Sequence, residues 1–161
     1  MLRFKVMKNI IILTFLLIFA SCSEYPHQGD SQIMEVVSKH LEEHSISFGN
    51  EVRNCIIIPG GGCSGCIASG ISFVKSHKDD FSKTQGKNVL VFTNILSLKK
   101  LKKQLNDVTL NDLNCIVDTS NIYLMHCNES IYPIILTLDK NALVGVKVQS
   151  PKENGLYEVE L

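Results

Sequence analysis

The sequence predicts an α/β domain with a mixed central β-sheet. Short apolar runs that suit buried strands alternate with segments in which apolar residues recur at helical spacing. Near the C-terminus, two further apolar runs flank a polar turn, which is the pattern of an antiparallel hairpin. Alternating strands and helices favour parallel strands covered on both faces, and the hairpin adds antiparallel strands. We therefore expect a three-layer α/β/α architecture.

The N-terminus has the composition of an export signal. A basic start leads into an apolar run over residues 10–19, which only Thr14 interrupts. The basic residues are Arg3, Lys5 and Lys8. The run is shorter than the ~20 apolar residues of a typical membrane span. It therefore reads as a secretory signal.

The end of this run resembles a bacterial lipobox, in which small residues precede a cysteine that is lipidated and becomes the mature N-terminus. The stretch here is Phe19-Ala20-Ser21-Cys22, with Phe where Leu is usual. We expect Cys22 to carry acyl chains such as palmitate, because two chains hold a protein on a membrane where one does not. An ordinary signal peptide followed by an incidental cysteine is the alternative.

The same signal divides the chain and sets its compartment. Residues 1–21 are expected to be a lipoprotein signal peptide, and residues 22–30 the lipidated cysteine and its tether. Residues 31–161 then form one domain. The expected location is the bacterial cell envelope, with the lipid anchored in a membrane at the periplasmic face or the cell surface.

The first half of the domain is expected to contain two helices and two strands. Residues 31–45 carry apolar side chains at four-residue spacing and predict an amphipathic helix. Residues 51–58 end in an apolar run and predict a strand covered on both faces, which the following Pro and Gly residues end. Residues 64–77 again have helical spacing, and residues 88–93 form a second buried strand.

The second half begins with a helix that Ser97 caps. Its inward-facing residues are Leu98, Leu101 and Leu105, and its outward-facing ones are Lys99, Lys100, Lys102 and Lys103. We interpret the lysines as a solvated face, with contact to anionic lipid as the alternative. Residues 115–118 predict a short strand, and residues 120–127 an irregular segment or a single helical turn. The hairpin is expected over residues 133–138 and 143–148.

The motif Cys63-Ser64-Gly65-Cys66 carries the most specific chemistry. A cysteine in the first turn of a helix lies near unpaired backbone N–H groups and the positive end of the helix dipole, which lowers its pKa. The second cysteine, one turn further on, can close a disulfide at little cost in loop entropy. Strand, CxxC and helix in this order suit thiol–disulfide exchange. An inert structural disulfide and a metal site are the alternatives, although zinc usually takes four ligands.

Composition limits the other possibilities. Sixteen basic and sixteen acidic residues balance, so no strong field indicates nucleic acid as a partner. Six cysteines in an exported chain permit disulfides. With Cys22 lipidated, the remaining cysteines are Cys55, Cys63, Cys66, Cys115 and Cys127. Because their number is odd, at least one thiol stays unpaired, which argues against a purely structural disulfide framework.

The order of these elements, ending in Tyr132-Pro133 before the hairpin, resembles the thioredoxin fold. The segments between Thr93 and Tyr132 are most similar to the exported TlpA-like branch, where a short strand ending in Asp and a helical turn precede an aromatic-Pro step. The resemblance implies that Cys63 is the attacking thiol and Cys66 the buried resolving thiol. It also implies that Pro133 is a cis-proline facing the disulfide.

Two positions depart from the pattern of thioredoxins themselves. Gly62 stands where they have Trp before the first cysteine, and the apolar run 56–58 lacks their buried carboxylate. The resemblance implies a lipid-anchored envelope thiol–disulfide oxidoreductase that needs no cofactor or metal and acts on protein thiols or disulfides. The alternative is a non-catalytic thioredoxin-fold lipoprotein that binds a partner and keeps the CxxC as a structural disulfide.

The remaining cysteines and histidines are given secondary roles. We expect Cys55 and Cys115 to behave as small buried apolar residues in strands, with a disulfide from Cys115 to Cys127 as a further possibility. Cys127, next to His126, is a candidate third thiol near the CxxC. Three further histidines are expected to be solvated: His40, His44 and His77.

Overall fold

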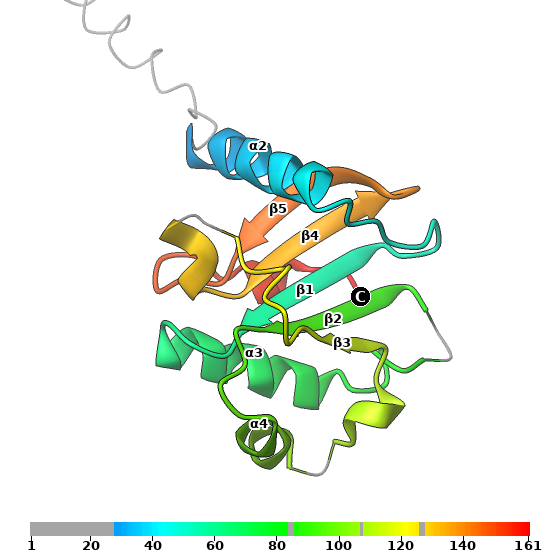
Figure 1. The fold of residues 1–161 in the computed structure, drawn as a ribbon, viewed down its shortest axis with the longest axis vertical. Coiled ribbons are helices and arrows are strands. Elements are labelled where there is room, and N and C mark those ends of the chain that lie inside the picture. Colours follow the sequence, from blue (N-terminus) through cyan, green and yellow to red (C-terminus); the bar gives the residue numbers. More distant parts are fainter. Residues whose placement is uncertain (1–27, 84–85, 107, 126–127) are drawn as a thin grey trace, which may run out of the picture.

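The computed structural model describes residues 28–161 except for 84–85, 107 and 126–127 (Figure 1). The expectations for the signal peptide, for acylation of Cys22 and for most of the tether therefore lie outside the described residues. The same holds for His126 and for Cys127 as a third thiol. In the part of the chain that is described, no helix combines the length and the apolar character needed to cross a membrane.

The core of the domain is a mixed sheet of five strands in the order β3-β2-β1-β4-β5. The strands are β1 (Asn54–Pro59), β2 (Asn88–Thr93), β3 (Cys115–Val117), β4 (Ile134–Asp139) and β5 (Ala142–Val148). Strand β1 is parallel to β2, which is parallel to β3. On its other side β1 is antiparallel to β4, which forms the hairpin with β5.

Helices cover both faces of this sheet. They are α2 (Gln28–Glu43), α3 (Ser64–Ser76) and α4 (Leu98–Leu105). Apolar side chains of α3 and α4 share one buried cluster with alternate residues of β1 and β2. Residues of α2 belong to a second cluster, together with Cys55 and Ile57 of β1 and apolar residues of both hairpin strands. Figure 1 shows α2 at the hairpin end, far from α4.

This arrangement confirms the predicted class, a three-layer α/β/α domain with a mixed sheet. Strand β1 is buried along its whole length because it lies at the centre of the sheet between two helical layers. Alternation of side chains sends Ile56 and Ile58 into the cluster of α3 and α4, and Cys55 and Ile57 into the cluster of α2. The strand order is compatible with a thioredoxin-like fold.

Several element boundaries differ from the predicted ones. Helix α2 begins at Gln28, so the last part of the expected tether is helical, and it ends at Glu43. Strand β1 begins later than predicted and includes Pro59. A 3-10 turn, Asn128–Ile131, precedes the hairpin and was not predicted. Single-turn elements of this kind give little periodic signal in a sequence.

The C-terminal segment after β5 packs on the sheet without forming an α-helix. Residues Gly155–Glu158 form one 3-10 turn, in which the Leu156 amide donates to Gln149 Oε1 at 3.2 Å. Leu156 is fully buried and belongs to the same cluster as α3. Val159 is partly buried against the same cluster, so Leu156 and Val159 pack there together.

Candidate functional site

The loop that leads from β1 to α3 is built from glycines because it passes close to other backbone. The Gly60 amide donates to Thr93 O at 2.8 Å, and a Cβ at Gly60 would lie 2.6 Å from Asn94 O. Gly62 has φ of 131°, and a Cβ there would lie 2.5 Å from Ile131 O. Only glycine accepts this conformation and this approach together. The loop therefore brings the start of α3 against Ile131.

Cys63 is the N-cap residue of α3. Its backbone is extended, with φ of −66° and ψ of 101°, while its carbonyl already accepts from the Ile67 amide at 2.9 Å. Its Sγ accepts from the Cys66 amide at 3.4 Å. This is the position where a Ser or Asp side chain would normally satisfy a free helix N–H group. A thiolate at Cys63 receives the same stabilisation from the amide and from the helix dipole.

Cys63 and Cys66 form a disulfide, with their Cα atoms 5.4 Å apart. The two sulfurs have different surroundings: Cys63 is half-buried, whereas Cys66 is only 6 % exposed and faces the core. A partner molecule can therefore reach the sulfur of Cys63 more easily than that of Cys66. This asymmetry is the geometry that a two-step exchange of disulfides requires.

The chain has to be interpreted from its own geometry. No protein-family model, no curated protein and no solved structure matches it. The site is thus defined by the disulfide, by the glycine loop before it and by the segment that Ile131 ends.

The segment before the hairpin contacts the site through Ile131 rather than through the backbone of Pro133. The Cys63 amide donates to Ile131 O at 3.1 Å. Pro133 is buried, and its Cγ lies 3.3 Å from the point that a Cβ on Gly70 of α3 would occupy. The cis conformation expected at Pro133 is wrong: the Tyr132–Pro133 bond is trans, as no cis peptide occurs among the described residues.

The trans bond has a simple physical reason. The trans form of an X–Pro bond is favoured by about 0.5–1 kcal/mol unless packing imposes the other isomer. Here the turn that ends at Ile131 already presents a carbonyl to the Cys63 amide. Sequence reasoning did not identify Ile131. The one signal that the sequence offers is an apolar residue directly before the Tyr-Pro step.

Asp118 is a buried carboxylate near the site's end of the sheet, but it does not act on the cysteines. Its oxygens accept hydrogen bonds from Thr93 Oγ1 (2.7 Å) and from the amides of Ser120 (3.2 Å), Ile122 (3.1 Å) and Tyr123 (2.8 Å). Burial alone would raise the pKa of Asp118, but these hydrogen bonds outweigh it and the pKa lies below its ordinary value. Asp118 therefore holds the turn that follows β3.

We expect Asp118→Asn to lower the free energy of unfolding at neutral pH by about 1–3 kcal/mol. Asn has one acceptor oxygen in place of two, so it cannot serve both the pair that shares Oδ2, Thr93 and the Tyr123 amide, and the pair of amides that shares Oδ1. One pair of donors therefore loses its acceptor. Because the folded pKa is depressed, the contribution of Asp118 is complete above the unfolded value of about 3.9 and is lost as pH falls through the lower folded pKa. Urea unfolding across pH measures this.

The control for this prediction is the wild-type chain over the same pH series. The difference in unfolding free energy between wild type and Asp118→Asn should be constant near neutrality and shrink in acid below about pH 4. A difference that persists unchanged in strongly acidic buffer would show that the charge of Asp118 contributes nothing.

The other described cysteines are free thiols. Cys55 is fully buried in the cluster of α2, and burial raises its pKa far above the ordinary value. Cys115 is half-buried and donates to Leu110 O at 3.3 Å; burial raises its pKa, and Lys83 partly offsets this. The structure has no disulfide at Cys115. Both thiols are poor nucleophiles, because the reactive species is the thiolate.

The described residues test the predictions for three histidines. His40 was expected to be solvated, but it is 7 % exposed, and its Nε2 lies 2.7 Å from Ile122 O. This prediction is wrong because α2 packs against a turn far along the sequence. His44 is exposed as expected. His77 is half-buried, and its Nδ1 lies 3.1 Å from Asp80 Oδ2. Among the residues described, no group of three His, Cys, Asp or Glu side chains is placed to hold a metal ion.

Proposed function

We propose that this protein is a thiol–disulfide oxidoreductase whose reacting atoms are the sulfurs of Cys63 and Cys66. The observation that supports this most strongly is the environment of Cys63. Its sulfur caps α3, accepts the Cys66 amide, and is more accessible than its disulfide partner. A purely structural disulfide needs none of these three features.

The exchange proceeds in two steps that balance. In the dithiol form, the Cys63 thiolate attacks one sulfur of a substrate disulfide, forming a mixed disulfide, and the departing substrate sulfur takes up a proton. Cys66 then loses its proton and attacks Cys63, which releases the second substrate thiol. After the second step the protein carries the Cys63–Cys66 disulfide, and the substrate has received two electrons. The reverse sequence oxidises a substrate dithiol.

The proton of Cys66 has no carboxylate acceptor close by in the described structure. Strand β1 places Ile56 and Ile58 beneath α3, and the buried carboxylate of Asp118 hydrogen-bonds only to Thr93 and the turn after β3. Water that reaches the half-buried Cys63 is therefore the proposed acceptor. This absence also favours the second candidate, a partner-binding protein whose CxxC is a fixed structural disulfide.

The proposed setting is the bacterial envelope, with the protein anchored through a lipid on Cys22. The sequence of the export signal and the lipobox supports it. Protein thiols or disulfides of that compartment are the proposed substrates, because disulfides persist there. If the protein instead binds a partner without exchange, the Cys63–Cys66 disulfide should not be reduced by any protein thiol of that compartment.

The test is reduction of a small disulfide, such as hydroxyethyl disulfide, by the whole chain with dithiothreitol as electron source. Turnover that disappears in Cys63→Ser and persists in Cys115→Ser supports the proposal. Cys115 is a suitable control because it is a half-buried thiol whose sulfur already hydrogen-bonds as a hydroxyl would. Equal rates in all three chains would refute a redox role for Cys63.

A further inference from the structure

Helix α4 carries a concentrated positive charge in a protein that is neutral overall. Four of its eight residues are lysine, while the whole chain has equal numbers of acidic and basic residues. The lysines are Lys99, Lys100, Lys102 and Lys103. None of them forms an ion pair with any described residue. The charge of α4 is thus available to something outside the domain.

Two of the four lysines are placed against the local stability of the helix, whereas Lys102 and Lys103 lie in the last turn, where the helix dipole favours basic residues. Lys99 and Lys100 lie in the first turn, where the helix dipole favours acidic residues, and the first turn contains none. Lysines three or four positions apart also repel one another. A Glu at position 100 would instead complete a capping box with Ser97, whose hydroxyl accepts the Lys100 amide at 3.3 Å. A role in binding explains why basic residues occupy these positions.

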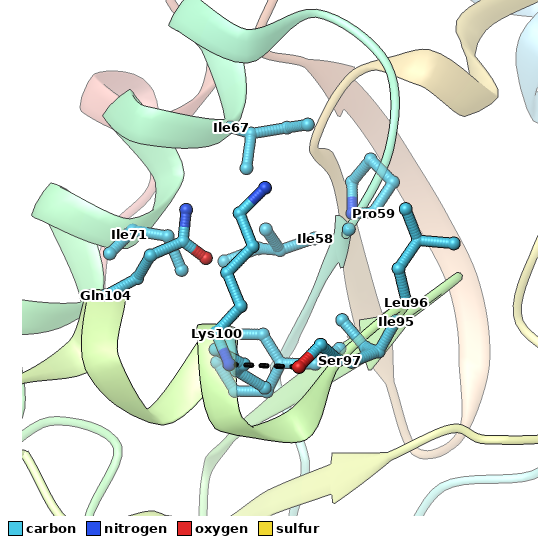
Figure 2. Close-up of a pocket in the computed structure, with 12 residues that line it drawn as sticks. Ile58, Pro59, Ile67, Ile71, Ile95, Leu96, Ser97, Lys100 and Gln104 are labelled. Carbon is cyan, nitrogen blue, oxygen red and sulfur yellow. Dashed lines mark hydrogen bonds between the residues drawn. The ribbon is translucent and has the colours of Figure 1, made fainter.

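An apolar groove lies directly beside the lysines, between α4 and α3. Side chains from β1, α3, α4 and the loop after β2 line it, among them Pro59, Ile67, Ile71, Leu96, Lys100 and Gln104. Figure 2 shows the Lys100 side chain crossing this hollow from α4 towards Ile67. The groove therefore combines an apolar floor with a cation at its centre.

Two exposed leucines flank Ser97 at the start of α4, and one of them, Leu96, lines the groove. Leu96 is 85 % exposed, and Leu98 is 45 % exposed, although helical spacing predicted that Leu98 faces inward. Only Leu101 and Leu105 of α4 are buried. The prediction for Leu98 is wrong because the core does not reach the first turn of α4. An exposed large apolar side chain beside an apolar groove indicates a binding surface.

The groove adjoins the disulfide. Gly60 lines it three residues before Cys63, and Ile67 lines it one helical turn after Cys63. A polypeptide held in the groove would have its neighbouring residues close to the Cys63 sulfur. Binding there would raise the local concentration of a substrate disulfide at the reacting atom.

We propose that this groove, the α3–α4 groove, binds an acidic polypeptide segment with Leu or Ile side chains in the protein whose disulfide is exchanged at Cys63. The proposal rests on the function proposed above. Apolar side chains fill the floor, and Asp or Glu pairs with the unpaired lysines. Charge complementarity of this kind speeds encounter and selects partners.

A lipid surface is the other partner that four lysines could meet, but the fold argues against it. Helix α2 begins at Gln28 and packs on the opposite face of the sheet from α4 (Figure 1). Six residues of extended chain from Cys22 reach about 20 Å, less than the ~30 Å diameter of a small domain. An anchor at Cys22 therefore keeps the face of α2, not α4, towards the membrane.

The first test measures binding separately from exchange. Three fluorescent peptides share one leucine-bearing sequence with Ser in place of Cys and carry Glu, Gln or Lys at the flanking positions. Fluorescence anisotropy with the whole disulfide-form chain should show the Glu peptide bound most tightly. For the variant Lys100→Glu/Lys103→Glu, the Kd of the Glu peptide should rise about tenfold or more. The control variant Lys78→Glu/Lys152→Glu makes an equal charge change at other exposed lysines and should leave this Kd unchanged.

Folding of the tested variant is checked in the same samples. A Glu at position 100 suits the helix start, whereas a Glu at position 103 replaces a lysine that the helix dipole favours in the last turn. The two effects oppose each other, so the midpoint of thermal unfolding of Lys100→Glu/Lys103→Glu should stay close to that of wild type. Weaker binding by a chain of similar thermal stability cannot be attributed to unfolding. Equal Kd values for the three peptides would overturn the proposal.

The second test measures exchange with the same peptides carrying an internal disulfide. The dithiol form of wild type should reduce the Glu peptide about tenfold faster than the Lys peptide, and salt should remove the difference. If the Glu peptide binds but no peptide is reduced, the groove stands and the proposed redox function fails. If the chain reduces all peptides equally, the redox function stands and the groove proposal fails.

A vesicle-binding experiment distinguishes a lipid surface from an acidic peptide as the partner of α4. Cys22→Ser chain, which cannot be acylated, is mixed with vesicles of phosphatidylcholine and phosphatidylglycerol and sedimented. The proposal predicts that the chain stays in solution. Sedimentation that Lys100→Glu/Lys103→Glu abolishes, together with equal affinity for the three peptides, would assign α4 to lipid instead.

Discussion

Replacing Cys66 by serine is expected to turn the protein into a trap for its substrates. The Cys63 thiolate of this variant still attacks a substrate disulfide, because its helix cap and its exposure are unchanged. The resolving thiol one turn away is gone, and an external thiol has no comparable orientation. The mixed disulfide should therefore persist, and turnover should fall at least about a hundredfold.

Mass spectrometry of the intact chain under non-reducing conditions measures the trapped species. Cys66→Ser should gain the mass of a model peptide, and Cys63→Ser should gain none, because its remaining CxxC sulfur lies 6 % exposed against the core. Cys115→Ser is the matched control and should exchange like wild type. Capture by Cys63→Ser as efficient as by Cys66→Ser would contradict the assigned roles.

Replacing Gly62 by alanine is expected to destabilise the domain by about 3 kcal/mol, the upper end for a strained backbone position. The residue has φ of 131°, and the added methyl would lie 2.5 Å from Ile131 O and 2.8 Å from its Cα. Either Ile131 or the loop must move, which breaks the hydrogen bond from the Cys63 amide. Urea unfolding measures the loss in unfolding free energy. The rate of disulfide exchange at Cys63 should also differ from that of wild type.

Gly65→Ala provides the matched control for this substitution. A Cβ at Gly65 meets nothing within 4 Å, and the residue lies in the first turn of α3. Alanine is there expected to be neutral or to stabilise the helix by up to about 1 kcal/mol. If both glycines respond alike, the contact between Gly62 and Ile131 does not hold the loop in place. The presence of Gly at position 62, where thioredoxins have Trp, would then need an explanation other than the contact with Ile131.

The site's principal residues could be predicted because their signals are local. An apolar run, glycines, a cysteine and helical spacing follow one another within residues 54–76, and each fixes its own backbone. That order predicts a cysteine in the first turn of the helix, and the structure makes Cys63 the N-cap residue just before that turn. The burial of Cys66 was implied only by the resemblance to thioredoxins. The hairpin was predictable for the same reason: Lys140 and Asn141 form its turn with positive φ.

The features that the sequence did not reveal depend on contacts between distant segments. His40 is buried because a carbonyl 82 residues away faces it. Ile131 meets the Cys63 amide because the turn before the hairpin folds back on α3. Periodicity placed Leu98 on the inner face of α4, but it carries no information on how far the core extends beneath that face. Of these features, the contact of Ile131 is the one made with the disulfide site itself.

We expect Cys63 and Cys66 to form a reversible redox couple. To measure this, the whole chain is equilibrated in glutathione buffers of graded potential, and free thiols are alkylated before mass spectrometry. A single two-electron transition that belongs to Cys63 and Cys66 should be reached within minutes and lie within the range spanned by glutathione. A disulfide that stays closed even under excess dithiothreitol would show instead that the CxxC is a fixed structural disulfide.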